Sequence, residues 1–266
     1  MMEHEQSEYP ITDSVPILGS TEMTQAAQGP TCIVGVGASA GGLAALEVFF
    51  DHMPSDVGLA FIVVQHLSPD YKSLLGEILR KYTVMPIVEA EHDMPIQSNH
   101  IYLIPPGKMM TMKEGRLQLT ETVKHPAVHM SIDMFFRSLA ANYGNRAVAI
   151  VLSGTGADGS NGIMDIKEAG GLVIAQDSQT AKFDGMPNSA KMTGKVDDVL
   201  SPKQMPERLI QHMRGFGVVN LSSNQEQLTT EQLIQLILRR SGRIAELILR
   251  ITNETVCCVE SNAVWS

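Results

Sequence analysis

Cysteine is scarce in this sequence, and the few cysteines do not form the pattern of a disulfide-stabilised fold. The chain has 266 residues and three cysteines. Cys257 and Cys258 are adjacent, and Cys32 lies far from both of them in the sequence. A small secreted domain would show an even, regularly spaced set instead. The scarcity therefore excludes a disulfide scaffold.

Long apolar runs are also missing. Glycine, glutamine or histidine interrupts every apolar stretch well before the roughly 20 residues that a membrane-spanning helix requires. The first residues, MMEHEQSEYPITDS, are acidic and polar, and they lack the basic region and apolar core of a signal peptide. We therefore expect a cytoplasmic protein.

Positive charge is in deficit. Lysine and arginine number 20 against 29 aspartates and glutamates, which gives a formal net charge of −9 and a pI near 5.3. This balance argues against nucleic-acid binding, which needs a basic face that releases counterions from phosphates. The 44% of hydrophobic and 18% of charged residues are typical of a globular protein with one main domain.

The composition divides the chain into three segments. Residues 1–29 are rich in serine, threonine, glutamine and proline without periodicity, which predicts a flexible N-terminal arm. Residues 30–216 predict the folded domain. Residues 217–266 predict a linker and an amphipathic helical tail, whose apolar face would need burial against another surface.

Residues 30–216 predict an α/β fold of the doubly wound type. Helical patterns separate short, continuous apolar runs at residues 31–37, 59–67, 147–154 and 171–177. Strands that are apolar throughout and alternate with helices form a mainly parallel sheet covered on both faces. We therefore expect a Rossmann-like, three-layer arrangement.

Two local features add detail to this fold. The alternating stretches HIYLIPPG and KMMTMKEGRLQLTE, with a turn at Glu114–Gly115, predict an antiparallel hairpin. The stretch SIDMFFRSLAANYG predicts a helix in which Ser131 is the candidate N-cap and Asp133 lies in the first turn.

The stretch GVGASAGG, residues 35–42, has two interpretations. The G-x-G-x-x-G/A turn that holds a dinucleotide fits Gly35, Gly37 and Ala40. The G-x-S-x-G turn that exposes a nucleophilic serine fits Gly37, Ser39 and Gly41.

The residues around this stretch disfavour a dinucleotide. Such a site needs an acidic residue at the end of the second strand to bind the ribose hydroxyls. This chain has Gln65 and His66 there, and Ala40 replaces the third glycine. An α/β-hydrolase is also disfavoured, because its serine lies well inside the sheet and its triad runs Ser, Asp, His.

Polar residues follow three of the predicted strands. Ser39 comes after the first strand, His66 ends the second, and Asp158 lies in GTGADGSNG after a later one. In open parallel sheets, chemistry gathers at the carboxyl ends of the strands. A serine, a histidine and an aspartate together can perform nucleophilic acyl transfer. Each residue alone has a simpler interpretation. Ser39 could cap the helix that follows it, His66 could be a structural histidine whose hydrogen bonds are made at a strand end, and Asp158 could stabilise a glycine-rich turn.

The remaining histidines and methionines point to no cofactor or metal. His125 and His129 have helical spacing, but Pro126 lies between them and argues against a helical metal site. His92 beside Asp93 is expected in a solvated loop. The hairpin methionines are expected to fill the core, and the alternative is that exposed methionines grip a helical substrate.

Four stretches resemble a known family. GVGASAGGLAAL, VVQHLSPDY, VLSGTGADGSNG and FDGMPNSA, in this order and spacing, resemble the catalytic domain of the chemotaxis protein-glutamate methylesterases, the CheB family, over about residues 31–215. The resemblance implies a serine hydrolase that removes methyl groups from γ-glutamyl methyl esters on chemoreceptors and deamidates receptor glutamines. The implied partner is the cytoplasmic helices of a methylated chemoreceptor.

The resemblance also implies roles for individual residues. Ser39 would be the nucleophile, His66 the general base and Asp158 the acid that orients it, while the backbone N–H of Thr155 would bind the oxyanion. Ala40 stands where many members have threonine, so any hydrogen bond from that hydroxyl to the histidine is missing.

The flanking segments depart from the usual family pattern. The arm before the first strand is too short for the receiver domain of two-domain members, since domains that fold alone usually need more than about 40 residues. We therefore expect activity without a phosphodonor. The helical pattern from about Thr229 to Arg250 faintly resembles the opening helices of the receptor methyltransferase, and a plain docking helix is the alternative. The competing function is a non-catalytic signalling scaffold, which would not need an intact triad.

Overall fold

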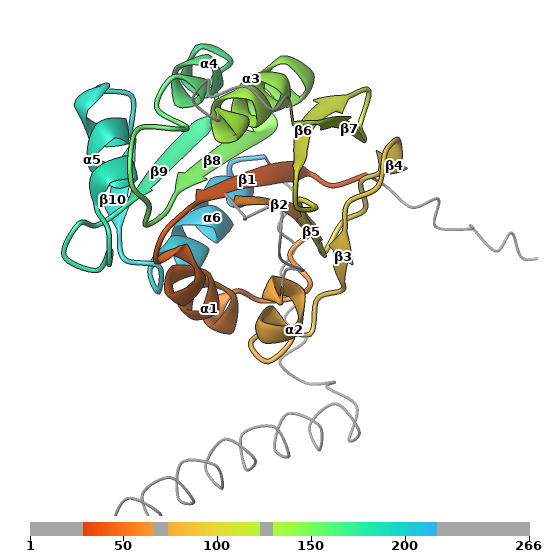
Figure 1. Ribbon diagram of the computed structural model, residues 1–266, viewed down its shortest axis with the longest axis horizontal. Coiled ribbons are helices and arrows are strands. Elements are labelled where there is room, and N and C mark those ends of the chain that lie inside the picture. Colours follow the sequence, from red (N-terminus) through yellow and green to blue (C-terminus); the bar gives the residue numbers. More distant parts are fainter. Residues whose placement is uncertain (1–28, 66–73, 123–129, 217–266) are drawn as a thin grey trace, which may run out of the picture.

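The computed structural model describes residues 29–65, 74–122 and 130–216, which form helices packed around a central sheet (Figure 1). The strands are β1 (Cys32–Ala38), β2 (Leu59–Gln65), β3 (Ile87–Glu89), β4 (Met94–Pro95), β5 (His100–Leu103), β6 (Lys108–Lys113), β7 (Arg116–Glu121), β8 (Ala147–Val151), β9 (Leu172–Gln176) and β10 (Asp198–Leu200). The helices are α1 (Gly42–His52), α2 (Leu75–Leu79), α3 (Ser131–Tyr143), the 3₁₀ turn η1 (Gly144–Arg146), α4 (Gly162–Glu168), α5 (Gly185–Met192) and α6 (Met205–Arg214). None of these helices is long and apolar enough to cross a membrane.

The central sheet is parallel throughout. Its seven strands lie in the order β10-β9-β8-β1-β2-β5-β3. The first strand of the chain lies in the middle, and later strands extend the sheet on both sides of it. This order confirms the predicted doubly wound, mainly parallel sheet.

A small antiparallel sheet, in the order β4-β7-β6, lies beside the large one. The predicted turn at Glu114 and Gly115 joins β6 to β7, and both residues have positive φ, 50° and 73°. The hairpin prediction is confirmed for this stretch. It is wrong for residues 100–103, which form β5 and pair in parallel with β2 and β3. Three of the four β5 residues are buried, as expected of an inner strand that is covered on both faces.

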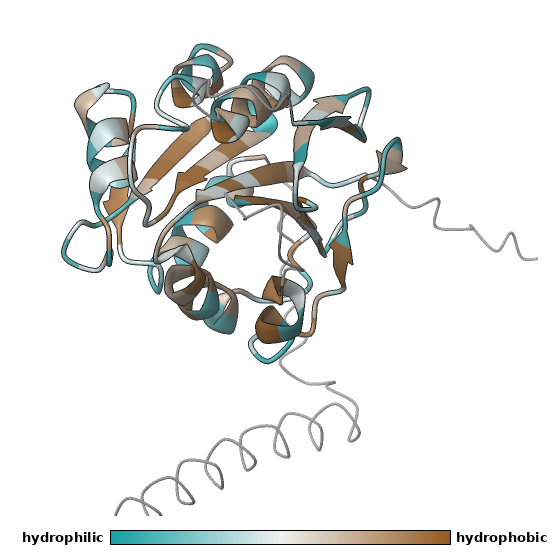
Figure 2. Ribbon diagram, in the orientation of Figure 1, coloured by the Kyte–Doolittle hydropathy of each residue, from teal (hydrophilic) through white to brown (hydrophobic). Residues whose placement is uncertain are grey.

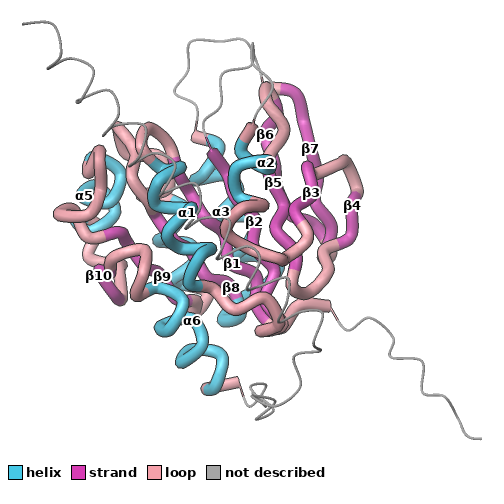
Figure 3. Tube along the Cα trace, turned by 90° about the horizontal axis from the view of Figure 1, so that it is seen from below, coloured by secondary structure: helices cyan, strands magenta, loops and turns pink. Residues whose placement is uncertain are grey.

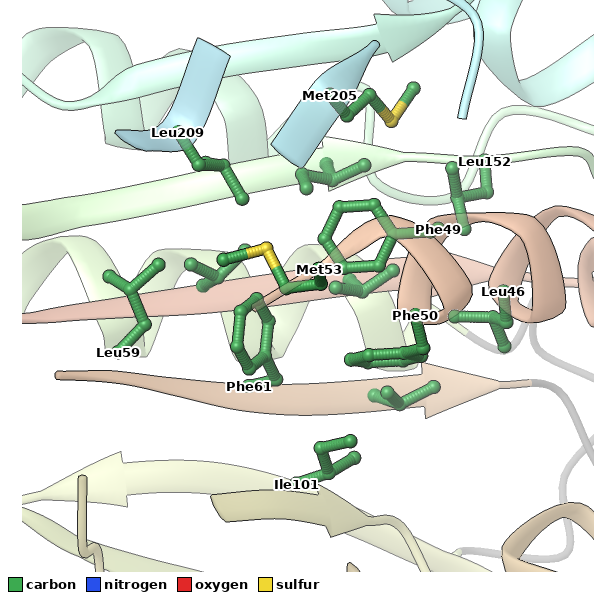
Figure 4. Close-up of a cluster of buried hydrophobic side chains, with 14 of the residues drawn as sticks. Leu46, Phe49, Phe50, Met53, Leu59, Phe61, Ile101, Leu152, Met205 and Leu209 are labelled. Atoms are coloured by element: carbon green, nitrogen blue, oxygen red, sulfur yellow. The ribbon is translucent and has the colours of Figure 1, made fainter. Parts of the chain in front are cut away.

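Two apolar cores hold the layers together. Helices α1, α2 and α6 cover one face of the sheet, while α3, α4, α5 and the small sheet cover the other (Figures 1 and 3). The inner strands of the large sheet are the most hydrophobic segments, and the outward sides of the helices are hydrophilic (Figure 2). On the α1 side, Phe49, Phe50 and Phe61 pack edge to face with ring centroids 5.0 to 5.8 Å apart (Figure 4).

Glycines in β1 allow α3 to lie directly against the strand. A Cβ atom on Gly35 would lie 2.9 Å from Cε1 of Phe135 and 3.0 Å from Cε1 of Phe136. A Cβ atom on Gly37 would lie 2.6 Å from Cγ2 of Ile132. Both glycines lie inside the strand. The G-x-G of residues 35–37 therefore serves helix packing and not a phosphate-binding turn.

This packing predicts opposite outcomes for one substitution at two glycines. Gly35→Ala should lower the free energy of unfolding by about 1–3 kcal/mol, because the added methyl overpacks a core of buried rings. Gly76→Ala, in α2, should leave stability unchanged or raise it by up to about 1 kcal/mol, because its Cβ would make an ordinary 3.4 Å contact and alanine favours helix. Urea unfolding of both variants measures the difference, and equal effects would contradict the packing role of Gly35.

Candidate active site

Ser39 lies in a tight turn between the central strand and the first helix. Its backbone N–H donates to the carbonyl of Ser153 over 3.0 Å, and its own carbonyl accepts from Gly42 N–H over 2.9 Å. The turn passes through Gly41, which has φ +75° and is the N-cap of α1. Gly41, which has no side chain, is therefore the N-cap residue of this helix, and Ser39 lies two residues before it. The half-buried serine therefore sits at the carboxyl end of β1, as the nucleophile hypothesis expects.

The segment that follows β8 lies directly against this serine. A Cβ atom on Gly154 would lie 2.9 Å from the Cβ of Ser39 and 2.1 Å from the sulfur of Met186. A Cβ atom on Gly41 would lie 2.8 Å from the Oγ of Ser153. Glycine at these two positions permits the close approach of the β1 and β8 ends.

Ser153, which the sequence analysis did not single out, connects the segments around Ser39. Its side chain is fully buried, and its backbone N–H donates to Oε1 of the buried Gln176 over 2.8 Å. Its hydroxyl faces the carbonyls of Ala40 and Phe183, at 2.9 and 3.1 Å, and accepts the N–H of Phe183 over 3.0 Å. Nothing in the sequence distinguishes it from any serine at a strand end, because its partners come from three distant segments.

Asp158 lies in the loop after β8 and is buried, with 7% of its surface exposed. Its Oδ2 accepts the N–H of Ile132 over 3.0 Å, and its Oδ1 accepts the N–H of Asp133 over 2.9 Å. These bonds cap the start of α3, whose own N-cap, Met130, supplies no side-chain bond. The predicted capping by Ser131 is wrong, since that residue is the first of the helix and a distant carboxylate takes the role.

One helix residue brings the Ser39 and Asp158 segments together. Cγ2 of Ile132 lies 2.6 Å from the ideal Cβ position of Gly37 and 2.9 Å from that of Gly159. These glycines are two residues before Ser39 and one residue after Asp158. Both candidate residues therefore leave the same edge of the sheet beside the start of α3.

His66 lies outside the described residues. Strand β2 ends at Gln65, which pairs with Ala38 in the parallel ladder, one residue before Ser39. The described part of β2 thus stops at the same edge of the sheet. The role of His66 as the base stays a prediction.

Thr155 is exposed and follows Gly154 in the loop next to Ser39. Gly154 is fixed on both sides, since its N–H donates to the carbonyl of Phe183 and its carbonyl accepts from Met186, each over 2.9 Å. Within the described ranges, no protein acceptor takes the backbone N–H of Thr155 or of Ala40. These two N–H groups flank the serine and can donate to an anionic oxygen there.

Other reactive side chains serve the fold. Cys32 is fully buried in β1, and burial raises the pKa of its thiol to about 11, with Arg146 opposing that shift. Nδ1 of His92 lies within hydrogen-bonding distance of the backbone of Leu119, at 3.1 Å from O and 3.2 Å from N, which ties the loop that carries His92 to strand β7. His125 and His129 fall outside the described residues. Among the residues that the structure describes, no group of three or more His, Cys, Asp or Glu could hold a metal ion.

Methionines divide between the core and the surface. Met110 and Met112 of the hairpin are buried, which confirms that they fill the core. Met130 and Met134, at the start of α3, are exposed. Phe183, whose backbone bonds Ser153 and Gly154 beside Ser39, is exposed as well. Exposed apolar side chains thus flank the Asp158 and Ser39 segments.

Comparison with known proteins identifies relatives of this chain. A family model described as CheB methylesterase matches residues 34–209. The crystal structure of the Thermotoga maritima CheB methylesterase catalytic domain matches with a TM-score of 0.63 and 29% identity, over 68% of this chain and 97% of that one.

Longer relatives match only in part. Protein-glutamate methylesterase/protein-glutamine glutaminase 1 of Xanthomonas campestris pv. campestris is 34% identical over 182 residues, which is 67% of this chain and 51% of that protein. An uncharacterized 104.1 kDa protein of Rhodobacter capsulatus is 44% identical over 126 residues, 47% of this chain and 13% of that protein. The chain spans about half the length of the Xanthomonas relative and less of the other.

The contacts of Ser153 predict its contribution to the site. Ser153→Ala should lower the free energy of unfolding by about 1–3 kcal/mol, because it leaves the N–H of Phe183 and the carbonyl of Ala40 without their partner. Ser189→Ala is the matched control: its hydroxyl makes one 3.1 Å bond to the carbonyl of Gly156, so its effect should stay within about 0.5 kcal/mol. Urea unfolding compares the two, and equal small losses would show that Ser153 does not hold these segments.

Proposed function

The chain belongs to the CheB methylesterase family, and on this premise we propose that it hydrolyses γ-glutamyl methyl esters on the cytoplasmic helices of chemoreceptors, with Ser39 as the nucleophile. The observation that carries this proposal is the position of Ser39 at the end of the central strand, beside the N–H groups of Ala40 and Thr155, for which the described part of the chain supplies no acceptor. We place the activity in residues 30–216 and regard residues 217–266 as an appended segment. The name of the Xanthomonas relative supports deamidation of receptor glutamines as a second reaction of the same site.

The first step is acyl transfer to the enzyme. The Oγ atom of Ser39 attacks the ester carbonyl while His66 takes the hydroxyl proton. The carbonyl oxygen becomes an anion, and the N–H of Thr155 and that of Ala40 donate to it. The helix dipole of α1, which begins directly after this turn, adds positive potential at the same place.

The second step returns the enzyme to its starting state. The tetrahedral intermediate expels methanol, which receives its proton from His66, and an acyl-Ser39 ester remains. Water then attacks this ester, His66 takes a proton from the water, and the Oγ of Ser39 leaves with that proton. The released product is the receptor glutamate, and for a glutamine substrate the first leaving group is ammonia.

Asp158 stabilises the positive charge that His66 acquires in both steps. Its oxygens each accept one backbone N–H from α3, and a carboxylate oxygen can accept more than one N–H, including that of an imidazole. The two backbone bonds fix the plane of the carboxylate, so that its orientation does not depend on the histidine. Because residue 40 is alanine, no hydroxyl at that position assists the base.

Ser39→Ala should leave the fold intact and lower the rate of methanol release by about four to six orders of magnitude. The fold should persist because Gly41, not Ser39, is the N-cap residue of α1, and the loss of a capping hydroxyl costs only about 1 kcal/mol. Ser201→Ala is the matched control, since Ser201 also follows a parallel strand directly, but at the sheet edge, where its hydroxyl bonds Gln204 over 2.7 Å. The assay measures methanol from a methyl-labelled chemoreceptor.

Two results of this assay would contradict the proposed function. Comparable activity in folded Ser39→Ala would overturn the choice of nucleophile. A wild-type chain that binds the receptor and releases no methanol would favour the scaffold function.

The proposed base predicts a loss of activity in acid. An ordinary histidine titrates near about pH 6.5, and a carboxylate in contact raises that value. Protonation removes the acceptor for the serine proton, so activity should be present above the pKa and lost below it. The pH dependence of kcat/KM should show an apparent pKa within about two units of 6.5. A rate that stays flat from about pH 5 to 8, in protein that remains folded, would rule out His66 as the base.

A further inference from the structure

Asp133 is a buried carboxylate that lies outside the proposed set of catalytic residues. Only 4% of its surface is exposed. Its Oδ1 accepts the N–H of Asn161 over 2.9 Å and the N–H of Gly162 over 2.7 Å, and its Oδ2 accepts from Nδ2 of Asn161 over 3.1 Å. Asp133 therefore caps the start of α4, whose own N-cap residue makes no side-chain cap.

Each of the two helices is capped by a carboxylate from the segment of the other. Asp133, in the first turn of α3, caps α4, and Asp158, three residues before Asn161, caps α3. One of the N–H groups that Asp158 accepts belongs to Asp133 itself. The two aspartates thus form a reciprocal pair, in which each residue helps to fix the segment that carries the other.

The backbone around Asp158 depends on such external bonds. Gly156 and Gly159 flank it with φ values of +86° and +96°, a region that side-chain-bearing residues rarely adopt. Glycines lose more conformational freedom on folding than other residues, so a loop that contains them is weakly restrained by its own sequence. Strand β8 holds the upstream end of this loop, and Asp133 holds the downstream end at Asn161 and Gly162.

We propose that Asp133 is a positioning residue for the reaction, because it holds the Asp158 carboxylate in its working orientation. This inference rests on the proposed function, in which Asp158 stabilises His66. In the proposed mechanism Asp133 acts through Asp158, and not on the substrate or the base directly. Its loss would let the 156–161 loop relax and turn the Asp158 carboxylate away, and misplacement of a catalytic group by about 1 Å costs roughly 100-fold in rate.

The experiment compares three variants of the full chain. Asp133→Ala removes all the accepted bonds, while Asp133→Asn keeps one oxygen that can accept the N–H groups of Asn161 and Gly162. Asp165→Asn is the matched control: Asp165 lies in the first turn of α4, as Asp133 does in that of α3, and it joins α4 to α3 through a 3.2 Å pair with Arg137 on the surface. For each variant, kcat and KM for methanol release from a methylated chemoreceptor and the midpoint of thermal unfolding are measured.

Asp133→Ala should lower kcat about 10- to 100-fold with KM changed less than about twofold, and Asp133→Asn should recover most of that loss. Asp165→Asn should leave kcat within about twofold of wild type. Asp158→Asn supplies the second test. In that background Asp133→Ala should change kcat less than about twofold, because groups that act as a unit are not additive.

Several results would overturn the inference. One is an unchanged kcat in Asp133→Ala, accompanied only by a lower melting midpoint, which a purely structural cap would produce. Another is an equal loss of kcat in the wild-type and Asp158→Asn backgrounds. If Asp133→Ala does not fold, a kcat for folded Asp133→Asn as low as about 1% of wild type would also overturn it. Failure of the proposed function is recognised separately, since wild type would then release no methanol or Ser39→Ala would retain full activity.

Discussion

The site depends on the parallel pairing of β1 with β2 on one side and β8 on the other. Parallel strands that start in register also end at one edge, and the ladder here continues past the strands themselves. Leu152 N–H donates to the carbonyl of Gly37 over 2.9 Å, and Ser39 N–H donates to that of Ser153 over 3.0 Å. The position of the serine is therefore set by the same hydrogen bonds that build the sheet, and a precise site needs such rigid support.

The site also depends on the close approach of α3 to strand β1 and of the loop after β8 to Ser39. Glycines replace side chains in β1 and after β8, so α3 lies against the strand and the β8 loop lies against Ser39. This close packing of α3 on the strand allows the first N–H groups of α3 to reach the carboxylate of Asp158. Gly35 and Gly37 thus act on the site through packing, not through contact with a ligand.

Buried carboxylates are costly unless hydrogen bonds satisfy them. Asp133 and Asp158 meet this condition by using helix N-termini, where the unpaired N–H groups and the helix dipole both favour negative charge. Each helix in turn has no side-chain cap of its own. The exchange therefore satisfies two helix ends and two carboxylates at once, and it couples the α3–α4 interface to the edge of the sheet where the site lies.

The sequence by itself determined the features that depend on neighbouring residues. Apolar runs predicted the parallel strands, the Glu114–Gly115 pair predicted the hairpin, and a serine after the first strand predicted the position of Ser39. Only the tertiary structure revealed the contacts of Ser153 and Asp133, because their partners lie 23 to 113 residues away in the sequence. It also decided that β5 joins the parallel sheet and that Asp158, rather than Ser131, caps α3. Periodicity and turn preference act over a few residues, whereas these bonds form only after the strands and helices have packed.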